Sequence, residues 1–363
     1  MMKRAIALLV LLQLAAVFGV LGLSYVTGQG IILSYADRLT QRIARDTTAF
    51  TTEFLTPAAD AALLTRRLAR SQVLATADRD RLARYFFEIL QTRSDFSGLY
   101  LGRPDGSFTF VSRDEDPATA PFTVKQVMTR PVREVTLVGV DARFVPSDPR
   151  TDPDDDYDPR TRPWYVAAAR QDGVAWTAPY VFFTSRRPGI TVSAPVTGGI
   201  NGEFRGVVGV DIEIDALSAF LETLDISARG AAAIVAQDGT IIAHRDPDLL
   251  VPAQGDSLRL ATLADGNDPI LARAADSIKG GIDDLFPGEI RLARFQAGGE
   301  TWRGAVQRLP LERTPWTVMI YLPEADILGP LSGLVRRAVA LGLIAAALTV
   351  FVLVVFGRRM LRG

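Results

Sequence analysis

The stretch from Tyr157 to Tyr165 brings cationic and aromatic side chains together within one short segment. It reads Tyr-Asp-Pro-Arg-Thr-Arg-Pro-Trp-Tyr. Its prolines favour an extended entry into a short helix, because the residue before a proline avoids helical geometry and a proline is tolerated in the first helical turn. Arg offers a carboxylate two parallel donors, while Trp and Tyr supply walls with polar tips. The stretch is therefore either a site for a small polar molecule carrying a carboxylate or a surface loop anchored by its aromatics.

A carboxylate, Asp211, lies inside the apolar run from Gly206 to Ile214, which is rich in β-branched residues. Such a run is typical of a central strand of an antiparallel sheet. A carboxylate in a buried strand has a high free-energy cost unless a cation or several donors compensate it. We therefore interpret Asp211 as the partner of a positive charge. The alternative is a carboxylate that faces solvent at a strand end.

Composition excludes several classes of site. The chain has no cysteine, which excludes thiol catalysis, disulfides and thiolate metal sites. Its one histidine, His244, excludes a metal site built from several histidines, and nothing beside it resembles an activated nucleophile, so we expect a core or capping role. The formal net charge is −1 and no basic stripe with interleaved aromatics is present, which argues against nucleic acid as a partner.

A run of aspartates precedes the aromatic stretch, at Asp152, Asp154, Asp155 and Asp156. A calcium-binding loop of the EF-hand type needs Gly at its sixth position and Glu at its twelfth. Counted from Asp152, those positions hold Tyr157 and Pro163. We therefore interpret residues 147–157 as a solvated acidic loop, and we expect neither a metal nor a cofactor in this protein.

Two apolar runs lie near the chain ends, from Ala5 to Thr27 and from Ala338 to Phe356. Each approaches the ~20 residues that a membrane-spanning helix requires. Basic residues on the outer side of both runs place both termini in the cytoplasm; they are Lys3, Arg4, Arg358, Arg359 and Arg362. We predict transmembrane helices at 5–27 and 336–357, with cytoplasmic ends at 1–4 and 358–363. A cleaved signal peptide is the alternative for the first run, disfavoured by its length and by the lack of a small-x-small cleavage site.

Between the two runs, the pattern is first helical and then strand-like. One apolar face indicates a long stalk helix over 28–73, formed by Ile32, Tyr35, Leu39, Ile43, Phe50 and Phe54. We expect Pro57 to interrupt this helix. Ser97–Gly102 and Ser107–Val111 flank a Pro-Asp-Gly turn, which predicts a hairpin.

A second, smaller unit with both helices and strands is predicted after Leu224. Ala231–Ala236 and Thr240–His244 flank a Gln-Asp-Gly turn, and Arg303–Arg308 and Trp316–Tyr321 form another predicted strand pair. The fold class is therefore α+β, with two sheet-containing units between the apolar runs.

This organisation resembles the double Cache sensor domains of bacterial transmembrane receptors, and the resemblance covers nearly the whole chain. The Asp-Pro-Arg-x-Arg-Pro-Trp-Tyr core that begins at Asp158 is typical of the membrane-distal module of these sensors. The resemblance implies a long N-terminal helix followed by two stacked, PAS-like antiparallel-sheet modules, flanked by two transmembrane helices. A ligand-binding distal module would cover 74–224 and a membrane-proximal module 225–330.

More specifically, six positions are similar to the pattern of the amino-acid-binding subset of these domains: Tyr157, Arg162, Trp164, Tyr165, Tyr180 and Asp211. The resemblance implies that Arg162 holds the carboxylate of an amino acid, with Trp164 and a Tyr hydroxyl as further donors. Asp211 would neutralise the ammonium, assisted by Tyr157 or Tyr165. The ligand side chain would meet other pocket residues, for which we consider Tyr100, Val140 and Phe182.

The resemblance also implies a function. The chain would be the sensory segment of a two-pass receptor in the bacterial inner membrane, with residues 28–335 periplasmic and an amino acid as ligand. A homodimer through the long helix would fit such a receptor. Only a basic stub follows Phe356, so we expect the cytoplasmic output to come from a longer form of the chain or from a partner.

Four alternatives differ in their chemistry. A sensor for an amine would not need the carboxylate clamp, and a sensor for another small organic acid would not need Asp211. A membrane-anchored hydrolase is disfavoured, because the chain has one histidine and neither a nucleophile elbow nor a metal cluster, and we expect no enzymatic activity. In a purely structural module, the six matched positions would be coincidental.

Overall fold

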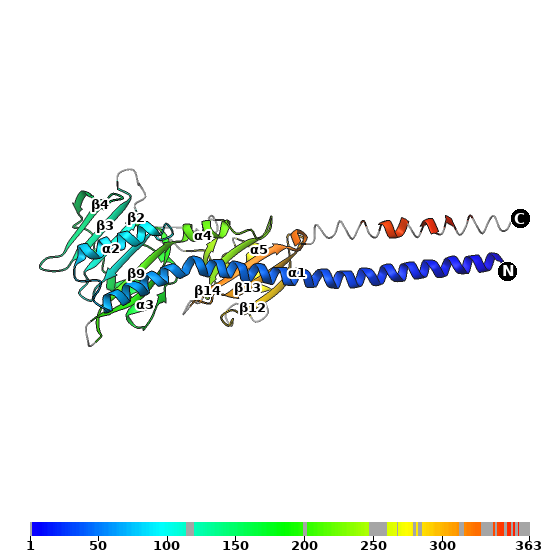
Figure 1. The fold of residues 1–363 in the computed structure, drawn as a ribbon, viewed down its shortest axis with the longest axis horizontal. Coiled ribbons are helices and arrows are strands. Elements are labelled where there is room, and N and C mark those ends of the chain that lie inside the picture. Colours follow the sequence, from blue (N-terminus) through cyan, green and yellow to red (C-terminus); the bar gives the residue numbers. More distant parts are fainter. Residues whose placement is uncertain are drawn as a thin grey trace.

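The computed structural model describes residues 2–113, 120–198, 202–246, 260–266, 268–278, 281, 285–311, 316–327 and, beyond these, 337, 340–344, 347–349, 351–352 and 355. One long helix runs along two antiparallel sheets that follow each other along its axis (Figure 1). The expected second transmembrane helix, 336–357, falls partly outside the described residues, and the stub 358–363 falls entirely outside them.

Helix α1 (Met2–Arg70) is continuous, and its N-terminal part projects beyond both sheets (Figure 1). The expected interruption at Pro57 is wrong, because the helix passes through this residue. Leu55, Ala58 and Ala62 on the same stretch are fully buried, and this packing compensates for the backbone hydrogen bond that a proline removes. Within the described part of the chain, no helical segment combines the length and the apolar character needed to cross a bilayer.

The first sheet has nine strands in the order β5-β4-β3-β2-β1-β9-β8-β6, with β7 also paired to β8. Its strands are β1 (Gly98–Gly102), β2 (Phe108–Arg113), β3 (Phe122–Met128), β4 (Glu134–Val140), β5 (Pro146–Thr151), β6 (Ala175–Trp176), β7 (Tyr180–Val181), β8 (Pro188–Gly198) and β9 (Glu203–Glu213). The predicted hairpin is confirmed as β1 and β2, which pair in antiparallel register.

Strand β5 corrects the expectation that residues 147–157 are loop throughout. Pro146 and Pro149 argue against a central strand, but β5 lies at the edge of the sheet and pairs only with β4. An edge strand tolerates proline because one side of its backbone needs no partner.

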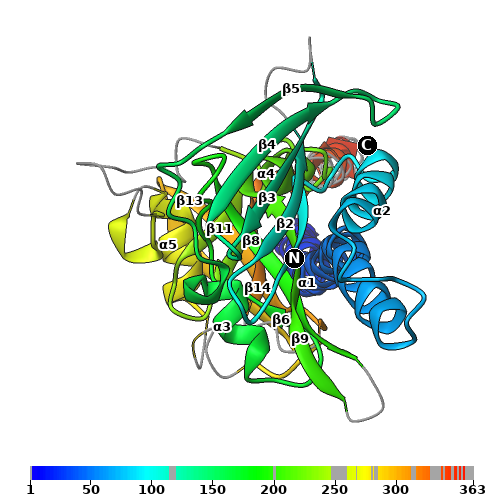
Figure 2. The same cartoon turned by 90° about the vertical axis from the view of Figure 1, so that its left-hand side faces the viewer.

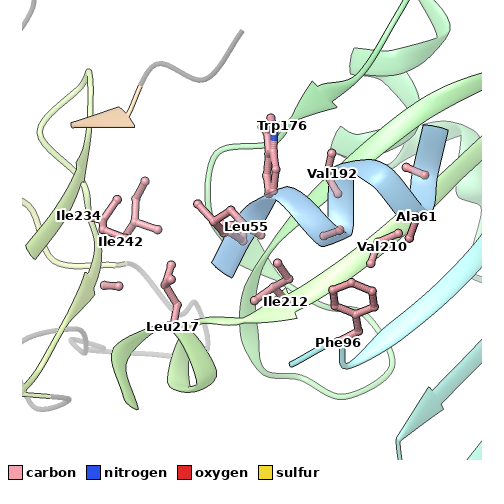
Figure 3. Packing of buried hydrophobic residues seen from close by; sticks show 14 of the residues in the cluster. Leu55, Ala61, Phe96, Trp176, Val192, Val210, Ile212, Leu217, Ile234 and Ile242 are labelled. Atoms are coloured by element: carbon pink, nitrogen blue, oxygen red, sulfur yellow. The ribbon is translucent and has the colours of Figure 1, made fainter. Parts of the chain in front are cut away.

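Helices cover both faces of this sheet. On one face, α1 and α2 (Arg79–Thr92) lie together beside the strands (Figure 2). The core between them includes Leu55 and Ala61 of α1, Val192 of β8 and Val210 of β9 (Figure 3). The other face carries an aromatic cluster that includes Tyr100, and there the short helices η1 (Pro159–Thr161) and α3 (Pro163–Ala169) pack. After β9, α4 (Ile214–Glu222) leads to the second sheet.

The second sheet has five strands in the order β11-β10-β14-β13-β12. Its elements are β10 (Ala231–Ala236), β11 (Ile241–His244), η3 (Leu263–Asp265), α5 (Pro269–Asp276), β12 (Ile290–Ala297), β13 (Glu300–Arg308) and β14 (Trp316–Pro323). The core cluster of the first sheet continues to this one through Leu217, Ile234 and Ile242 (Figure 3). His244 is buried, with Nε2 2.7 Å from the Tyr321 hydroxyl, which confirms the expected core role.

Candidate functional site

A cavity of about 330 Å³ opens on the aromatic face of the nine-stranded sheet. It is bounded by the sheet, by the η1–α3 segment and by the loop that follows β7. Five of the six residues predicted from the sequence line it: Tyr157, Arg162, Trp164, Tyr180 and Asp211. The fold therefore brings residues from three separate parts of the chain, 157–164, Tyr180 and Asp211, to the same cavity. The sixth, Tyr165, is not among the lining residues.

The η1–α3 segment owes its position to local capping and to one long-range contact. The Asp158 side chain accepts a hydrogen bond from the Arg160 amide at 2.9 Å, which starts η1 at Pro159. Pro163 then begins α3. A proline is tolerated there, because the N–H of the first helical residue has no partner within the helix. The hydroxyl of Ser193 on β8 donates to the Trp164 carbonyl at 2.9 Å, so this bond ties the start of α3 to the sheet.

Asp211 is 6% exposed and takes part in a hydrogen-bond network. The hydroxyls of Tyr100 and Thr191 both donate to its Oδ1, each at 2.5 Å. The Tyr180 hydroxyl lies 2.7 Å from Thr191 Oγ1, and because the Thr191 proton is directed to Asp211, Tyr180 is the donor in this pair. No described residue donates a hydrogen bond to Oδ2, so this oxygen is available to a ligand.

The titration of this network follows from its burial. Burial raises the pKa of Asp211 to about 7, although the hydrogen bonds from Thr191 and Tyr100 act in the opposite direction. Burial, and then the Asp211 charge, raises the pKa of Tyr100 and Tyr180 well above the usual range, so both hydroxyls stay protonated. Asp211 is thus a carboxyl group that ionises near neutral pH, and a positively charged partner would stabilise its ionised form.

Arg162 lies among aromatic rings instead of pairing with an acid. Its guanidinium carbon is 5.9 Å from the ring centre of Tyr157, 5.7 Å from that of Tyr180 and 5.8 Å from that of Phe183. Its Nη2 donates to the Val181 carbonyl at 3.4 Å. No ion pair joins Arg162 to Asp211 or to any other described residue. A guanidinium and a carboxyl group therefore share one cavity without an ion pair between them, an arrangement whose chemistry is complementary to the two ends of a zwitterion.

Tyr157 is positioned by a buried ion pair that the sequence analysis missed. The Lys125 ammonium, on a side chain that is 1% exposed, pairs with Asp155. Asp155 Oδ1 in turn accepts a hydrogen bond from the Tyr157 amide at 2.9 Å. Lys125 Nζ also lies 4.9 Å from the Tyr157 ring centre and 5.2 Å from that of Phe183. The interpretation of 147–157 as a solvated loop is therefore wrong at Asp155, because a buried cation holds this side chain inward.

Other expected pocket residues divide between the two faces of the sheet. Tyr100 and Phe182 line the cavity, whereas Val140 belongs to the core on the opposite face. Tyr165 is buried behind Trp164, with the two ring centres 5.5 Å apart. Of the two tyrosines considered for the ammonium end, only Tyr157 thus lines the cavity. Among the described residues, no group of His, Asp and Glu is arranged to hold a metal ion.

Comparisons with known proteins give relatives of this chain. A family model described as the Cache domain matches residues 29–331. The methyl-accepting chemotaxis protein PscA of Pseudomonas syringae is 36% identical over 96 residues, which are 26% of this chain and 15% of that protein. PctB of Pseudomonas aeruginosa, also a methyl-accepting chemotaxis protein, is 30% identical over 146 residues, which are 40% of this chain and 23% of that protein. The matched part thus spans less than a quarter of either relative.

Solved structures resemble this chain in fold. The ligand-binding domain of the amino acid chemoreceptor PctB in complex with L-Gln has a TM-score of 0.51 and 22% sequence identity, over 83% of this chain and 98% of that one. The same domain in complex with L-Arg has a TM-score of 0.50, also at 22% identity, over 85% and 96% of the two chains. At this level of identity, the likeness extends to the arrangement of helices and sheets.

Proposed function

The chain belongs to the Cache domain family, and from this premise we propose that it senses a free amino acid outside the cytoplasm for a transmembrane signalling receptor. The observation that carries the proposal is the pair Arg162 and Asp211, which line one cavity without an ion pair between them. The relatives named as chemotaxis proteins support a role in signalling, and the solved PctB domain, named as that of an amino acid chemoreceptor, supports the choice of ligand.

The cavity offers each end of an amino acid a partner of opposite charge. Arg162 would donate to the ligand carboxylate, with the Trp164 indole N–H as a further donor. Asp211 Oδ2 would accept from the ammonium, while Tyr100 and Thr191 hold the other carboxylate oxygen. Charged hydrogen bonds contribute about 1.5–3 kcal/mol each, and three or four of them with some apolar burial reach the roughly 8 kcal/mol of a micromolar complex.

The topology of the receptor is part of the proposal. Residues 5–27 and 336–357 would span the inner membrane, with 28–335 in the periplasm, divided into a distal module at 74–224 and a proximal module at 225–330. A continuous α1 supports this topology, because it would join the first span directly to the sheet that carries the cavity. We also propose a homodimer through α1, and a signalling output that lies outside this sensor segment, which itself has no catalytic role.

Two measurements on the purified chain test the site: a thermal-shift screen that finds a ligand, and calorimetry that measures its affinity. A thermal-shift screen of amino acids identifies a ligand, because binding to the native state raises the melting temperature. We expect the corresponding amine, which lacks the carboxylate, and the corresponding acid, which lacks the ammonium, to bind at least 100-fold more weakly. Arg162→Ala and Asp211→Asn should each weaken binding by a similar factor, because each leaves one ligand charge in the cavity without its partner.

Arg170→Ala is the matched control, since Arg170 is an exposed arginine at the end of α3 and does not line the cavity. This variant should bind as the unaltered chain does. If Arg162→Ala or Asp211→Asn keeps the original affinity, the zwitterion site is refuted. If the amine binds as well as the amino acid, an amine sensor replaces the proposal.

A further inference from the structure

The cavity extends well beyond the two charges assigned to the zwitterion. Its volume of about 330 Å³ lies within the roughly 300–1,000 Å³ typical of small-molecule sites. Asp211 is on β9, near one end of the strand order, and the cavity continues across the sheet to Leu137 on β4 and Arg150 on the edge strand β5. These two residues face each other in the β4–β5 register. The part of the cavity on the β2–β5 side would therefore accommodate the ligand side chain.

The charges that line the cavity are three arginines and two carboxylates: Arg113, Arg150, Arg162, Asp211 and Glu213. Arg113 is already engaged, because its guanidinium donates to the carbonyls of Leu90, Arg93 and Phe96. Glu213 is also engaged, with its Oε2 3.2 Å from Arg187 Nη1. The proposed function assigns Arg162 and Asp211 to the backbone groups of the ligand.

Arg150 is the lining charge that remains. It is exposed, and it makes no hydrogen bond or ion pair with any described residue. A second cation, Lys125, lies behind the same aromatic wall in its pair with Asp155. With a zwitterion bound between Arg162 and Asp211, Arg150 is thus the charged residue without a described partner among the described lining residues, and none of the described lining carboxylates is left without one.

We infer that the ligand is an acidic amino acid, whose side-chain carboxylate is attracted by Arg150. This inference rests on the proposed function and names the class of its ligand. A carboxylate would complement the remaining charge, a neutral amide of the same size would leave it uncompensated, and a cationic side chain would add to it. Because Arg150 lies at an exposed rim and solvent screens its charge, we expect about tenfold tighter binding of glutamate than of glutamine, and weaker binding of lysine than of either.

Titration calorimetry with glutamate, glutamine and lysine tests this inference on the full chain and on two variants. Arg150→Gln should remove the preference for glutamate over glutamine, while the affinity for glutamine changes less than about threefold. Arg143→Gln is the matched control, because Arg143 is an exposed arginine in the turn between β4 and β5 that does not line the cavity. It should keep the tenfold preference. The preference should also decrease at high salt, since the interaction is electrostatic.

The outcomes separate this inference from the proposed function. If glutamine, lysine or an apolar amino acid binds more tightly than glutamate, and does so through Arg162 and Asp211, the acidic ligand is refuted and the amino acid sensor stands. If Arg150→Gln keeps the full preference for glutamate, the role of Arg150 is refuted. If no amino acid binds the unaltered chain, both proposals are refuted.

Discussion

Asp211 is the residue on which the proposed recognition of the ammonium depends. It is buried in a central strand, yet it lacks a cationic partner among the described residues and relies on two hydroxyl donors. Such a carboxyl group is costly to ionise, and its pKa is raised to about 7. The ammonium group of a ligand would stabilise the ionised carboxylate and so offset this cost.

The pKa of Asp211 predicts how affinity depends on pH. Below a pKa of about 7, the carboxyl group is mostly neutral, and a neutral carboxyl cannot pair with an ammonium. As pH falls from 7, the affinity for an amino acid should therefore decrease, approaching tenfold per pH unit, because one proton must be released for binding. Calorimetry between pH 5.5 and 8 in buffers of different ionisation enthalpy would measure both the affinity and the released proton.

The ligand carboxylate is not the source of this dependence, since α-carboxyl groups ionise well below the tested range. Asp211→Asn provides the internal control, because the weak binding that remains should lose its pH dependence. An affinity that stays constant from pH 5.5 to 8 would show that Asp211 is ionised in the empty site or does not contact the ligand.

At the scale of elements, strand β3 supports the loop that carries Tyr157. Lys125 and Asp155 have side chains that are 1% and 8% exposed, and they join the sheet to this loop. Burial lowers the pKa of Lys125, and its pairing with Asp155 opposes that effect. The ion pair thus holds the aromatic wall of the cavity in place from behind.

Removing one partner of this pair should destabilise the protein strongly. Lys125→Met removes the nearer counter-charge of the buried Asp155 carboxylate and leaves only the Arg133 guanidinium, with Nη2 4.0 Å from Asp155 Oδ1, so we expect a loss of about 3 kcal/mol in the free energy of unfolding. Urea denaturation measures this loss, and adding Asp155→Asn should recover part of it. Arg42→Ala breaks an exposed pair on α1 with Asp46 and should cost less than about 1 kcal/mol. Equal effects of Lys125→Met and Arg42→Ala would contradict the supporting role of the buried pair.

At the scale of the whole molecule, the cavity is connected to the second sheet through strand β8. Thr191, which donates to Asp211, also exchanges hydrogen bonds with Thr177, at 2.9 and 3.0 Å. The neighbouring Trp176 contacts Trp316 at the start of β14, with ring centres 5.3 Å apart in an edge-on arrangement. A short chain of direct contacts therefore leads from the proposed ligand to the last strand of the second sheet.

This connection predicts an effect of the ligand at a distance. Binding should slow amide hydrogen exchange in β14, and Trp176→Leu should abolish that protection while the affinity changes less than about threefold, because Trp176 does not line the cavity. Trp302→Leu is the comparison, since Trp302 is a buried tryptophan that contacts Tyr321 of β14 but lies outside this route; it should change the exchange of β14 without ligand, yet keep the slowing that the ligand causes. Protection of β14 that persists in Trp176→Leu would rule out this route.

Much of the local structure could be predicted from the sequence, because it depends on neighbouring residues. Alternation of apolar residues and a Pro-Asp-Gly turn predicted the β1–β2 hairpin, and the α+β class followed from such patterns. At Pro57 and in β5, local rules gave the wrong expectation, since burial of α1 and the edge position of β5 are properties of the assembled fold.

For the candidate site, the sequence predicted the residue types and their order, but it did not predict which side chains would contact them in space. Charge and aromatic character singled out Arg162 and Asp211, and both line the cavity. Thr191 could not be found in this way, because its contact with Asp211 depends on the register between β8 and β9. Trp164 and Tyr165 differ by about 100° around a helix, so only the tertiary packing of α3 decided which of them lines the cavity. The charge and hydrogen-bonding groups of a side chain follow from its residue type, which the sequence gives. The contacts between side chains far apart in the sequence depend on how the strands pair, which only the tertiary structure decides.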